Sequence, residues 1–586
     1  MYVAVTGSGK YKVIQFREDI RVPGTNKKKT KVIKTIGNYE KMLEEDPDVI
    51  SKLKEEALRI THENKMSKAP ITLKVSSDEI TSPEDVVKSF KFGHGLIKEI
   101  WKEMKLENYF LEKCDKRNAK SIEKALFYLT SHRCTNPLSI YSSASEQTFH
   151  AGLEPVGLDV MYKTLEVLSD QKEELIKHIA DFFEKKTNRS GPEAYYDVTT
   201  YSFESTKWGE LRLFGFSKDH KNNEVQVVMG LLLDNNGIPI TYEIFPGNTM
   251  DQNTLKKSVE NLKKLYKLDK ITLVADRGLN SGNNLEYLCN GGHDFVISYT
   301  LKRSAQTFKQ LVWEKTDWQE KKDETGEIIY KSKVIESVLE VKVPIKTENK
   351  ENKRGRPKKY DKINIPVKIH LTWSKKRAEK DKSDRERILE KLKKRLDKPY
   401  QLKAAIKRGS NQYLQMEIDT EGWKLDDEKI IEASRYDGYY AIITNNLNLD
   451  TEKVSDIYNG LWKIEDSFRV LKTDLKARPV FVWSDEHIKG HFAMCFISLC
   501  IIRYFQYLLK EHKEKNISAC KIMKALNEPT AIVQGSYPDN LITPIKLSQT
   551  YIDLSMILKR PLLKTNMTLT QFRACTKLDL SKNLKI

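Results

Sequence analysis

Three carboxylates occupy positions where a folded chain has little reason to place a charge. Asp197 lies within a stretch that has the pattern of a β-strand, and Asp276 ends the apolar run 271–275. A carboxylate within a strand costs desolvation energy, and the end of a buried strand is a common place for a site in an open α/β sheet. Glu465 falls inside an apolar helical stripe that also contains Lys472, so both charges are expected on the inward face of one helix.

Two chemical explanations are open for these charges. The first is a buried ion pair between Glu465 and Lys472. The second is a shared metal site, which the two aspartates favour, because three carboxylates suit two Mg²⁺ (or Mn²⁺) ions that prefer oxygen ligands and retain positions for water and phosphate. The sequence therefore predicts that Asp197, Asp276 and Glu465 hold two ions in one active site.

The excess of positive charge points to a polyanionic partner. Lys and Arg number 101 against 82 Asp and Glu, which gives a formal net charge of +19 over 586 residues. Much of this excess lies in residues 353–410, with 22 basic and 7 acidic side chains. Nucleic acid is the first partner to consider for such a segment, and a solvated surface is the alternative.

A short motif opens this basic segment. Residues 353–359 read KRGRPKK and resemble the hook that inserts two Arg side chains into the minor groove of AT-rich DNA. The motif makes Arg354, Arg356, Lys358 and Lys359 candidate DNA-binding residues. A targeting signal is the other interpretation of the same residues.

Cysteine usage and hydropathy bear on the compartment. Seven scattered cysteines without a C-x-x-C pair argue against a disulfide framework or a zinc finger and for a reducing compartment. The first ten residues lack the apolar segment of a signal peptide. The most apolar stretch, 492–509, is interrupted by Arg503 and Gln506, so it predicts a core helix. We expect no membrane partner and a cytoplasmic, nucleoid-associated location.

The elements expected around the carboxylates alternate between strands and helices. Strands are expected over 194–203, 211–216, 225–233, 238–245, 271–275, 295–299 and 439–444, and helices over 251–266, 282–289 and 454–475. This order is typical of a ribonuclease-H-like α/β fold. The segment between 299 and 438 breaks the order and predicts an insertion.

The spacing around Glu465 resembles a transposase signature. Tyr458, Glu465 and Lys472 fit the pattern Y-x2-R-x3-E-x6-K of a subclass of DDE transposases from bacterial and archaeal insertion sequences, and Leu461 stands where the pattern has Arg. Other neighbourhoods similar to that family are 196–200, 245–248, 275–278 and 464–469, with 478–479 downstream. The resemblance covers roughly residues 190–510, and a similar basic hairpin occurs near the N-terminus.

The resemblance implies a transposase that binds terminal inverted repeats, cleaves DNA at the element ends and joins the 3′-OH ends to target DNA by two-metal phosphoryl transfer. Its partners would be double-stranded DNA, as element ends and target, and a second copy in a homodimeric synaptic complex. Tyr458 and Lys472 would contact the DNA backbone. Trp462 would either stack on a displaced base or pack in the core. The signature Arg, which Leu461 replaces, would have no counterpart here, or Lys463 or Arg469 would fill its role.

Two rival functions share these residues. One is a metal-dependent DNA nuclease of the same fold that performs no strand transfer. The other is a catalytically inactive DNA-binding repressor, against which the presence of all three carboxylates argues.

Six regions are expected along the chain. They are a basic hairpin and linker helix over 1–75, a mainly helical DNA-end-binding region over 76–190, the first part of the catalytic core over 191–300, a β-rich and basic insertion domain over 301–436, the second part of the core with the Glu-bearing helix over 437–510, and a C-terminal helical region over 511–586. The hairpin, over 11–39, is interpreted either as a small surface element or as a module that contacts DNA ends.

Overall fold

The chain forms two compact units, residues 1–85 and 86–586. The computed structural model describes residues 1–21, 28–66, 89–187, 193–216, 223–266, 270–301, 306–314, 316–344, 360–396, 413–416, 423–535 and 540–584. The hook motif with Arg354, Arg356, Lys358 and Lys359 lies outside the described residues.

The first unit is a three-stranded antiparallel sheet with two helices. Its elements are β1 (Tyr2–Thr6), β2 (Val13–Arg21), β3 (Lys28–Asn38), α1 (Tyr39–Glu45) and α2 (Val49–Met66). Ile14 and Phe16 of β2 form a small core with Leu53 and Ala57 of α2. The strand pair predicted within 11–39 is present. The sequence pattern missed β1, because five residues are too few for an alternation to stand out.

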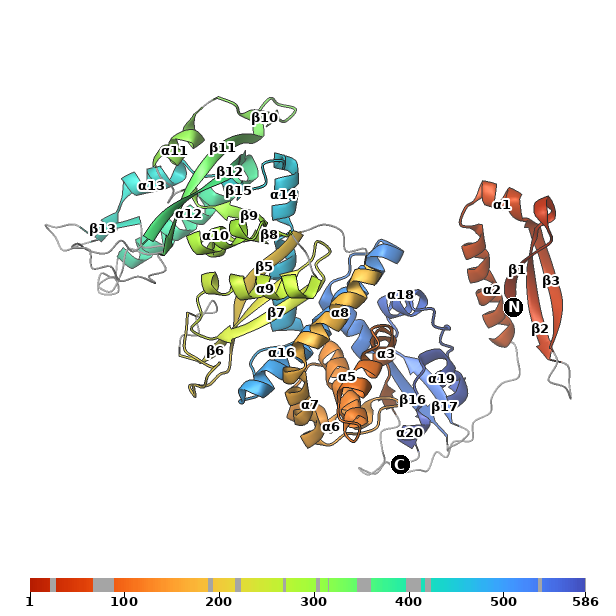
Figure 1. Cartoon of the computed structure of the whole chain (residues 1–586). Coiled ribbons are helices and arrows are strands. Elements are labelled where there is room, and N and C mark those ends of the chain that lie inside the picture. The colour runs from red at the N-terminus through yellow and green to blue at the C-terminus, as the bar shows by residue number, and fades with distance from the viewer. Residues whose placement is uncertain are drawn as a thin grey trace. The chain divides into compact units, whose positions relative to one another are not determined.

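A nine-stranded mixed sheet organises the second unit (Figure 1). The strand order is β10-β11-β12-β15-β9-β8-β5-β6-β7. The strands are β5 (Glu193–Ser202), β6 (Gln226–Leu233), β7 (Pro239–Pro246), β8 (Thr272–Ala275), β9 (Asp294–Tyr299), β10 (Gln319–Lys322), β11 (Ile328–Pro344), β12 (Tyr360–Ser374) and β15 (Tyr439–Thr444). Strands β5, β8 and β9 run parallel, and the other neighbours pair antiparallel. The protein is therefore a mixed α/β protein with a large mixed sheet.

The long strands of segment 301–436, β11 and β12, continue this sheet instead of forming one of their own. β12 pairs with β15 on one side and with β11 on the other, so both long strands extend the sheet that carries the aspartates. An exposed edge of β15 would present unpaired backbone groups, and β12 satisfies them. The β-rich part expected in this segment is present in β11, and a basic helix, α12 (Lys375–Leu396), follows β12. Leu392 of α12 is buried against Tyr413 and Leu414.

Helices cover both faces of the sheet and build the rest of the unit. Before the sheet come α3 (His94–Glu103), α4 (Leu106–Lys113), α5 (Ala119–Thr135), α6 (Ile140–Ser145), α7 (Leu158–Asp170) and α8 (Lys172–Lys186). Four more helices lie between strands of the sheet in the sequence: α9 (Leu255–Tyr266), α10 (Gly282–Asn290), α11 (Gln306–Trp313) and α13 (Asp427–Ser434). The short strands β13 (Leu414–Met416) and β14 (Trp423–Leu425) form a separate two-stranded sheet. The helical region predicted before residue 190 is thus present.

Two expectations about strands differ from the structure. Residues 211–216 form no strand, only a single bridge from Leu213 to Gln226. The C-terminal region contains helices α17 (Ala519–Asn527), α18 (Gln549–Ile557), α19 (Leu569–Thr576) and α20 (Ser581–Leu584), but also strands β16 (Thr530–Gln534), β17 (Leu541–Ile545) and β18 (Met567–Thr568). With β4 (Ser89–Lys91) these strands make a four-stranded sheet. Their partner β4 lies far away in the sequence, so no local pattern reveals the pairing.

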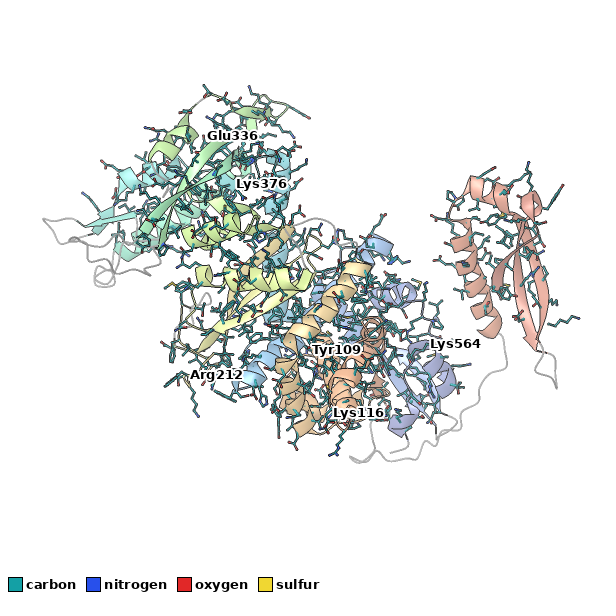
Figure 2. The ribbon with its side chains drawn as sticks, in the orientation of Figure 1. Tyr109, Lys116, Arg212, Glu336, Lys376 and Lys564 are labelled. Carbon is teal, nitrogen blue, oxygen red and sulfur yellow. The ribbon has the colours of Figure 1, made fainter. Side chains whose placement is uncertain are left out.

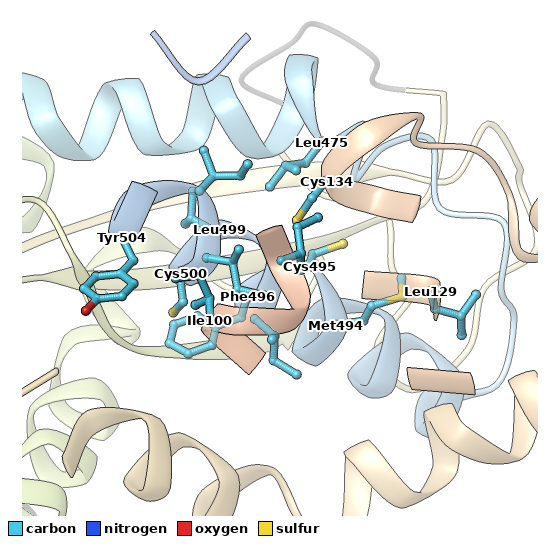
Figure 3. Close-up of a cluster of buried hydrophobic side chains, with 14 of the residues drawn as sticks. Ile100, Leu129, Cys134, Leu475, Met494, Cys495, Phe496, Leu499, Cys500 and Tyr504 are labelled. Carbon is cyan, nitrogen blue, oxygen red and sulfur yellow. The ribbon is translucent and has the colours of Figure 1, made fainter. Parts of the chain in front are cut away.

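The central helix of the main core is α16 (Asp485–Lys513). It packs against α5 and α7, and Figure 3 shows Met494, Phe496 and Leu499 of α16 gathered with Leu129 and Cys134 of α5. By length and composition α16 could cross a membrane, but 83% of its most apolar window is buried inside the protein. The core helix predicted over 492–509 is therefore present.

Three buried histidines meet beside α5. The ring centroid of His150 lies 5.5 Å from that of His94 and 5.6 Å from that of His132. Glu146 Oε2 lies 3.2 Å from His132 Nε2. Burial lowers the pKa of all three imidazoles, and that of His150 falls to about 4. All three are therefore neutral in the folded protein at pH 7.

We expect the protein to lose stability as the pH falls from about 6.5 toward 4. In the unfolded chain these histidines bind protons with an ordinary pKa, so below about pH 6.5 the unfolded state binds more protons than the folded state. Each histidine then lowers the free energy of unfolding by up to about 1.4 kcal/mol per pH unit. Urea unfolding at several pH values in this window measures the loss. His150→Asn should give a shallower dependence, and a free energy that stays constant across the window would contradict the prediction.

Candidate active site

The register of three parallel strands places Asp197, Asp276 and Ser298 in a row. Ala275 of β8 pairs with the residue before Asp197 on one side and with the residue before Ser298 on the other. The next residue on each strand therefore belongs to the row, and neighbouring strands lie about 4.8 Å apart. Ser298 Oγ donates a hydrogen bond of 3.1 Å to Asp276 Oδ1. The row thus brings together two predicted carboxylates and a hydroxyl that orients one of them.

All three side chains belong to one face of the sheet. Along β5, Tyr195 and Tyr201 lie in the core that contains α16, whereas Tyr196 and Val198 lie in the opposite core. Side chains alternate between faces with a period of two, so Asp197 shares the face of Tyr195 and Tyr201. The same alternation on β8 and β9 puts Asp276 and Ser298 on this face.

Glu465 reaches this row from an interrupted helix. α14 (Thr451–Asn459) ends before Gly460, α15 (Trp462–Arg469) follows, and a π-helical turn over Val470–Asp474 completes the segment. The prediction of one continuous helix over 454–475 is wrong. Glu465 is exposed, so it neither faces the core nor forms the buried ion pair that was the alternative.

The interruption lies where the backbone touches β5. A Cβ atom on Gly460 would lie 2.2 Å from Tyr195 Oη, so the close approach requires glycine. Tyr195 is buried, and the ammonium group of Lys463 lies 5.2 Å from its ring centroid. These contacts hold the start of α15 against the strand that carries Asp197.

Asp197, Asp276 and Glu465 line one cavity of about 350 Å³. The other lining residues are Tyr440, Tyr458, Asn459, Leu461, Trp462 and Ile464. In the described part of the chain, no three His, Cys, Asp or Glu side chains lie close enough together to hold one ion. The three carboxylates therefore share a cavity without converging on a point. All their donor atoms are carboxylate oxygens, which are the ligands that Mg²⁺ and Mn²⁺ prefer in proteins.

Tyr458 presents a neutral phenol to this cavity. Its ring packs against that of Tyr440 with centroids 5.7 Å apart. Burial, together with the neighbouring Tyr440 and Asp276, raises the pKa of Tyr458 well above its usual value. The phenol therefore keeps its proton at pH 7 and is able to donate a hydrogen bond to an anionic oxygen.

Trp462 lies at the same cavity with its side chain 61% exposed. The alternative that it packs in the core is therefore wrong. An exposed indole beside a carboxylate cavity provides an aromatic face on which a base can stack.

The predicted cations lie elsewhere. Lys463 Nζ donates a 2.7 Å hydrogen bond to the carbonyl oxygen of Asn235. Arg469 forms ion pairs of 2.6 Å with Asp466 and 3.4 Å with Asp474. The ammonium group of Lys472 lies 5.5 Å from the ring centroid of Tyr201. None of these three cations lines the cavity with the carboxylates.

Sequence reasoning missed Ser298, Tyr440 and Asn459. Ser298 follows the apolar part of β9 as Asp276 follows β8, so aligning the two predicted strands in parallel would have indicated it. Tyr440 and Asn459 carry no comparable signal, because their places depend on how β15 and α14 pack.

Residues 196–501 match a family model described as "Transposase DDE domain". No curated protein matches the chain. A similar solved structure is the synaptic complex of a piggyBac transposase with hairpin DNA; it has 10% sequence identity, and the alignment covers 83% of this chain and 82% of that chain with a TM-score of 0.33. The matched family region contains all three carboxylates of the cavity.

Replacing Gly460 by Ala should destabilise the protein by about 1–3 kcal/mol, because the added methyl group overlaps Tyr195. Urea unfolding measures the change. Gly157→Ala is the matched control, since nothing lies within 4 Å of a Cβ atom there, and it should change the free energy of unfolding by less than about 0.5 kcal/mol. Equal effects of the two substitutions would show that the contact with Tyr195 does not hold α15 in place.

Proposed function

The chain belongs to the transposase DDE-domain family, and we propose that it is the active transposase of a prokaryotic insertion element. It binds the terminal inverted repeats, cleaves DNA at the element ends and joins the freed 3′-OH ends to target DNA. The observation that carries this proposal is the meeting of Asp197, Asp276 and Glu465 at one cavity.

The same proposal includes the fold of the core, the assembly on DNA, the DNA contacts and the location in the cell. The sheet around β5, β8 and β9 is a ribonuclease-H-like core, and two copies of the chain assemble on double-stranded DNA in a synaptic complex. Lys472 and the basic hook 353–359 contact DNA. The enzyme works in the cytoplasm, associated with the nucleoid. The net charge of +19 supports a DNA partner.

Divalent metals are general cofactors of this family, and the oxygen donors of Asp197, Asp276 and Glu465 are the ligands that would hold two Mg²⁺ or Mn²⁺ ions. Such ions, when bound, activate an attacking oxygen and stabilise the leaving oxygen of an in-line displacement at phosphorus. Cleavage breaks the bond between phosphorus and the 3′ oxygen and adds water. In joining, the 3′-OH forms a new bond to a target phosphate, and the target's own 3′ oxygen leaves.

The neighbouring side chains prepare the cavity for DNA. Ser298 holds one carboxylate oxygen of Asp276 and so limits its rotation. The neutral phenol of Tyr458 donates a hydrogen bond to a phosphate oxygen, and Trp462 stacks on a base displaced from the duplex. No covalent intermediate with the protein is required.

Asp276→Asn should lower the rate of DNA cleavage by more than about 100-fold. Replacing a residue that only hydrogen-bonds to a metal ligand already costs roughly 10–100-fold in activity, so replacing a ligand itself should cost more. The substrate is labelled DNA carrying the sequences that flank the coding region, incubated with Mg²⁺, and the free 3′-OH ends and joined products are mapped. DNA binding, measured by gel shift, should be unchanged. Asp456→Asn is the control, an exposed carboxylate on α14 outside the cavity, and should retain activity.

Each rival function has its own outcome in this assay. Nicking that survives in Asp276→Asn rejects the site. Cleavage by the wild type without joined products identifies a nuclease. Binding of the flanking DNA without cleavage by the wild type identifies a repressor.

Trp462→Ala should weaken binding to DNA with unpaired bases at its end by roughly 5- to 150-fold, the usual loss for one stacked base. Affinity for the fully paired duplex of the same sequence should change little, because paired bases are not available for stacking. Fluorescence anisotropy with both DNAs measures the difference. Trp208→Ala, which removes another indole (74% exposed) outside the cavity, should leave both affinities unchanged. Equal losses on the two DNAs would contradict a stacking role.

A further inference from the structure

The carboxylate cavity lacks a cation of its own. Its lining, all from described residues, contains Asp197, Asp276 and Glu465 but neither Lys nor Arg. The position at which a basic residue is expected from the signature holds Leu461, which is buried. A DNA strand that carries one negative charge per nucleotide therefore needs positive charge from close by.

A second cavity, of about 520 Å³, adjoins the first. The two cavities share Asp276 and Tyr440 in their linings. The second is walled by the ends of β9 and β15 and by part of α12. Its charged lining consists of three arginines and four aspartates: Arg277, Arg377, Arg385, Asp276, Asp381, Asp384 and Asp437. In Figure 2, the labelled Lys376 marks the start of α12, directly before Arg377.

The three arginines of this second cavity differ in what they contact. Arg385 is partly buried, and its Nη1 contacts the two carboxylate oxygens of Asp437 at 2.5 and 2.6 Å. Its charge is therefore already neutralised. Arg277 is exposed in the turn after Asp276.

Arg377 is held in place while its hydrogen-bonding edge stays open. Its guanidinium lies 4.2 Å from the ring centroid of Tyr440, and its side chain is 46% exposed. Its Nε atom forms a half-exposed ion pair of 3.8 Å with Asp381 Oδ2, a distance too long for a hydrogen bond. Asp381 Oδ2 accepts a 3.0 Å hydrogen bond from the backbone of Gly438.

The guanidinium of Arg377 lies over Tyr440, which also lines the carboxylate cavity. Tyr440 packs on Tyr458, and both rings line the carboxylate cavity together with Asp276. Arg377 is thus linked to the carboxylate cavity through two aromatic rings. A planar guanidinium fixed on a ring keeps its edge N–H groups available for two parallel hydrogen bonds to phosphate.

We propose that Arg377 binds a phosphate of the DNA strand that enters the carboxylate cavity, beside the phosphate that is cleaved. This inference rests on the proposed function, since it assumes that the strand is cleaved there. Arg377 thereby supplies, from α12, the positive charge that Leu461 does not.

The test pairs one side chain with one phosphate. Arg377→Gln should lower kcat/KM for cleavage of the flanking DNA by at least about tenfold, as expected for a lost hydrogen bond between charged groups. Neutral methylphosphonate is then placed at each phosphate near the cleaved bond in turn. The wild type should lose a similar factor at one position, and Arg377→Gln should lose nothing further at that position.

Matched variants separate a contact from a general charge effect. Arg387→Gln removes the same charge from a side chain of α12 that is 65% exposed and lines neither cavity, so it should keep the wild-type pattern. Arg377→Lys keeps the charge without the planar fork and should restore sensitivity at the same phosphate. Thermal melting of all variants checks that they fold.

The outcomes distinguish this proposal from the one it rests on. If the wild type cleaves, Asp276→Asn does not, and Arg377→Gln keeps the wild-type sensitivity at every phosphate, the Arg377 proposal alone is overturned. Loss of sensitivity in an Arg277→Gln variant in place of Arg377→Gln also overturns it. If the wild type cleaves no DNA, the proposed function fails and the Arg377 proposal fails with it.

Discussion

The backbone hydrogen bonds among β5, β8 and β9 are the constraint on which the site depends. Their parallel register sets Asp197, Asp276 and Ser298 beside one another and on one face of the sheet. Side chains alternate with a period of two, so a slip of one residue between β5 and β8 would turn one aspartate into the opposite apolar core. Tyr196 and Val198 beside Asp197, and Val274 and Ala275 before Asp276, resist that slip, because they would have to leave their own cores. The sheet therefore fixes two carboxylates without any contact between them.

The third carboxylate is positioned by packing. Gly460 brings the backbone against Tyr195, and at the far end of the segment the buried Arg133 of α5 donates hydrogen bonds of 3.3 and 3.1 Å to the carbonyl oxygens of Leu475 and Lys476. The helical region thus holds the segment that bears Glu465. Since the strands are fixed by hydrogen bonds on both sides, we expect the adjustment that brings three carboxylates to shared ions to fall on the exposed, rotatable side chain of Glu465.

Local patterns in the sequence were enough to predict the strands of the aspartates, because an apolar run that ends in a carboxylate is contained within a few residues. They failed where a distant partner decides the structure. The apolar pattern over 454–475 predicts one helix, whereas the structure breaks it at Gly460, where the backbone approaches Tyr195. Residues 211–216 have the composition of a strand but find a single bridge at Leu213. The continuation of the sheet by β11 and β12 likewise depends on the free edge of β15, which no periodicity encodes.

Among the described residues, the lining of the carboxylate cavity contains no Lys or Arg, and under the proposed function this has an electrostatic reason. A cation inside the carboxylate cavity would neutralise the groups that must attract divalent ions, and it would raise the cost of bringing those ions in. A cation too far away would leave the DNA phosphates facing three carboxylates without compensation. The guanidinium of Arg377, which lines the adjoining cavity but not the carboxylate cavity, satisfies both requirements. An apolar Leu461 beside Glu465 is then consistent with DNA binding, because the positive charge enters from α12 at a position where it does not compete with the ions.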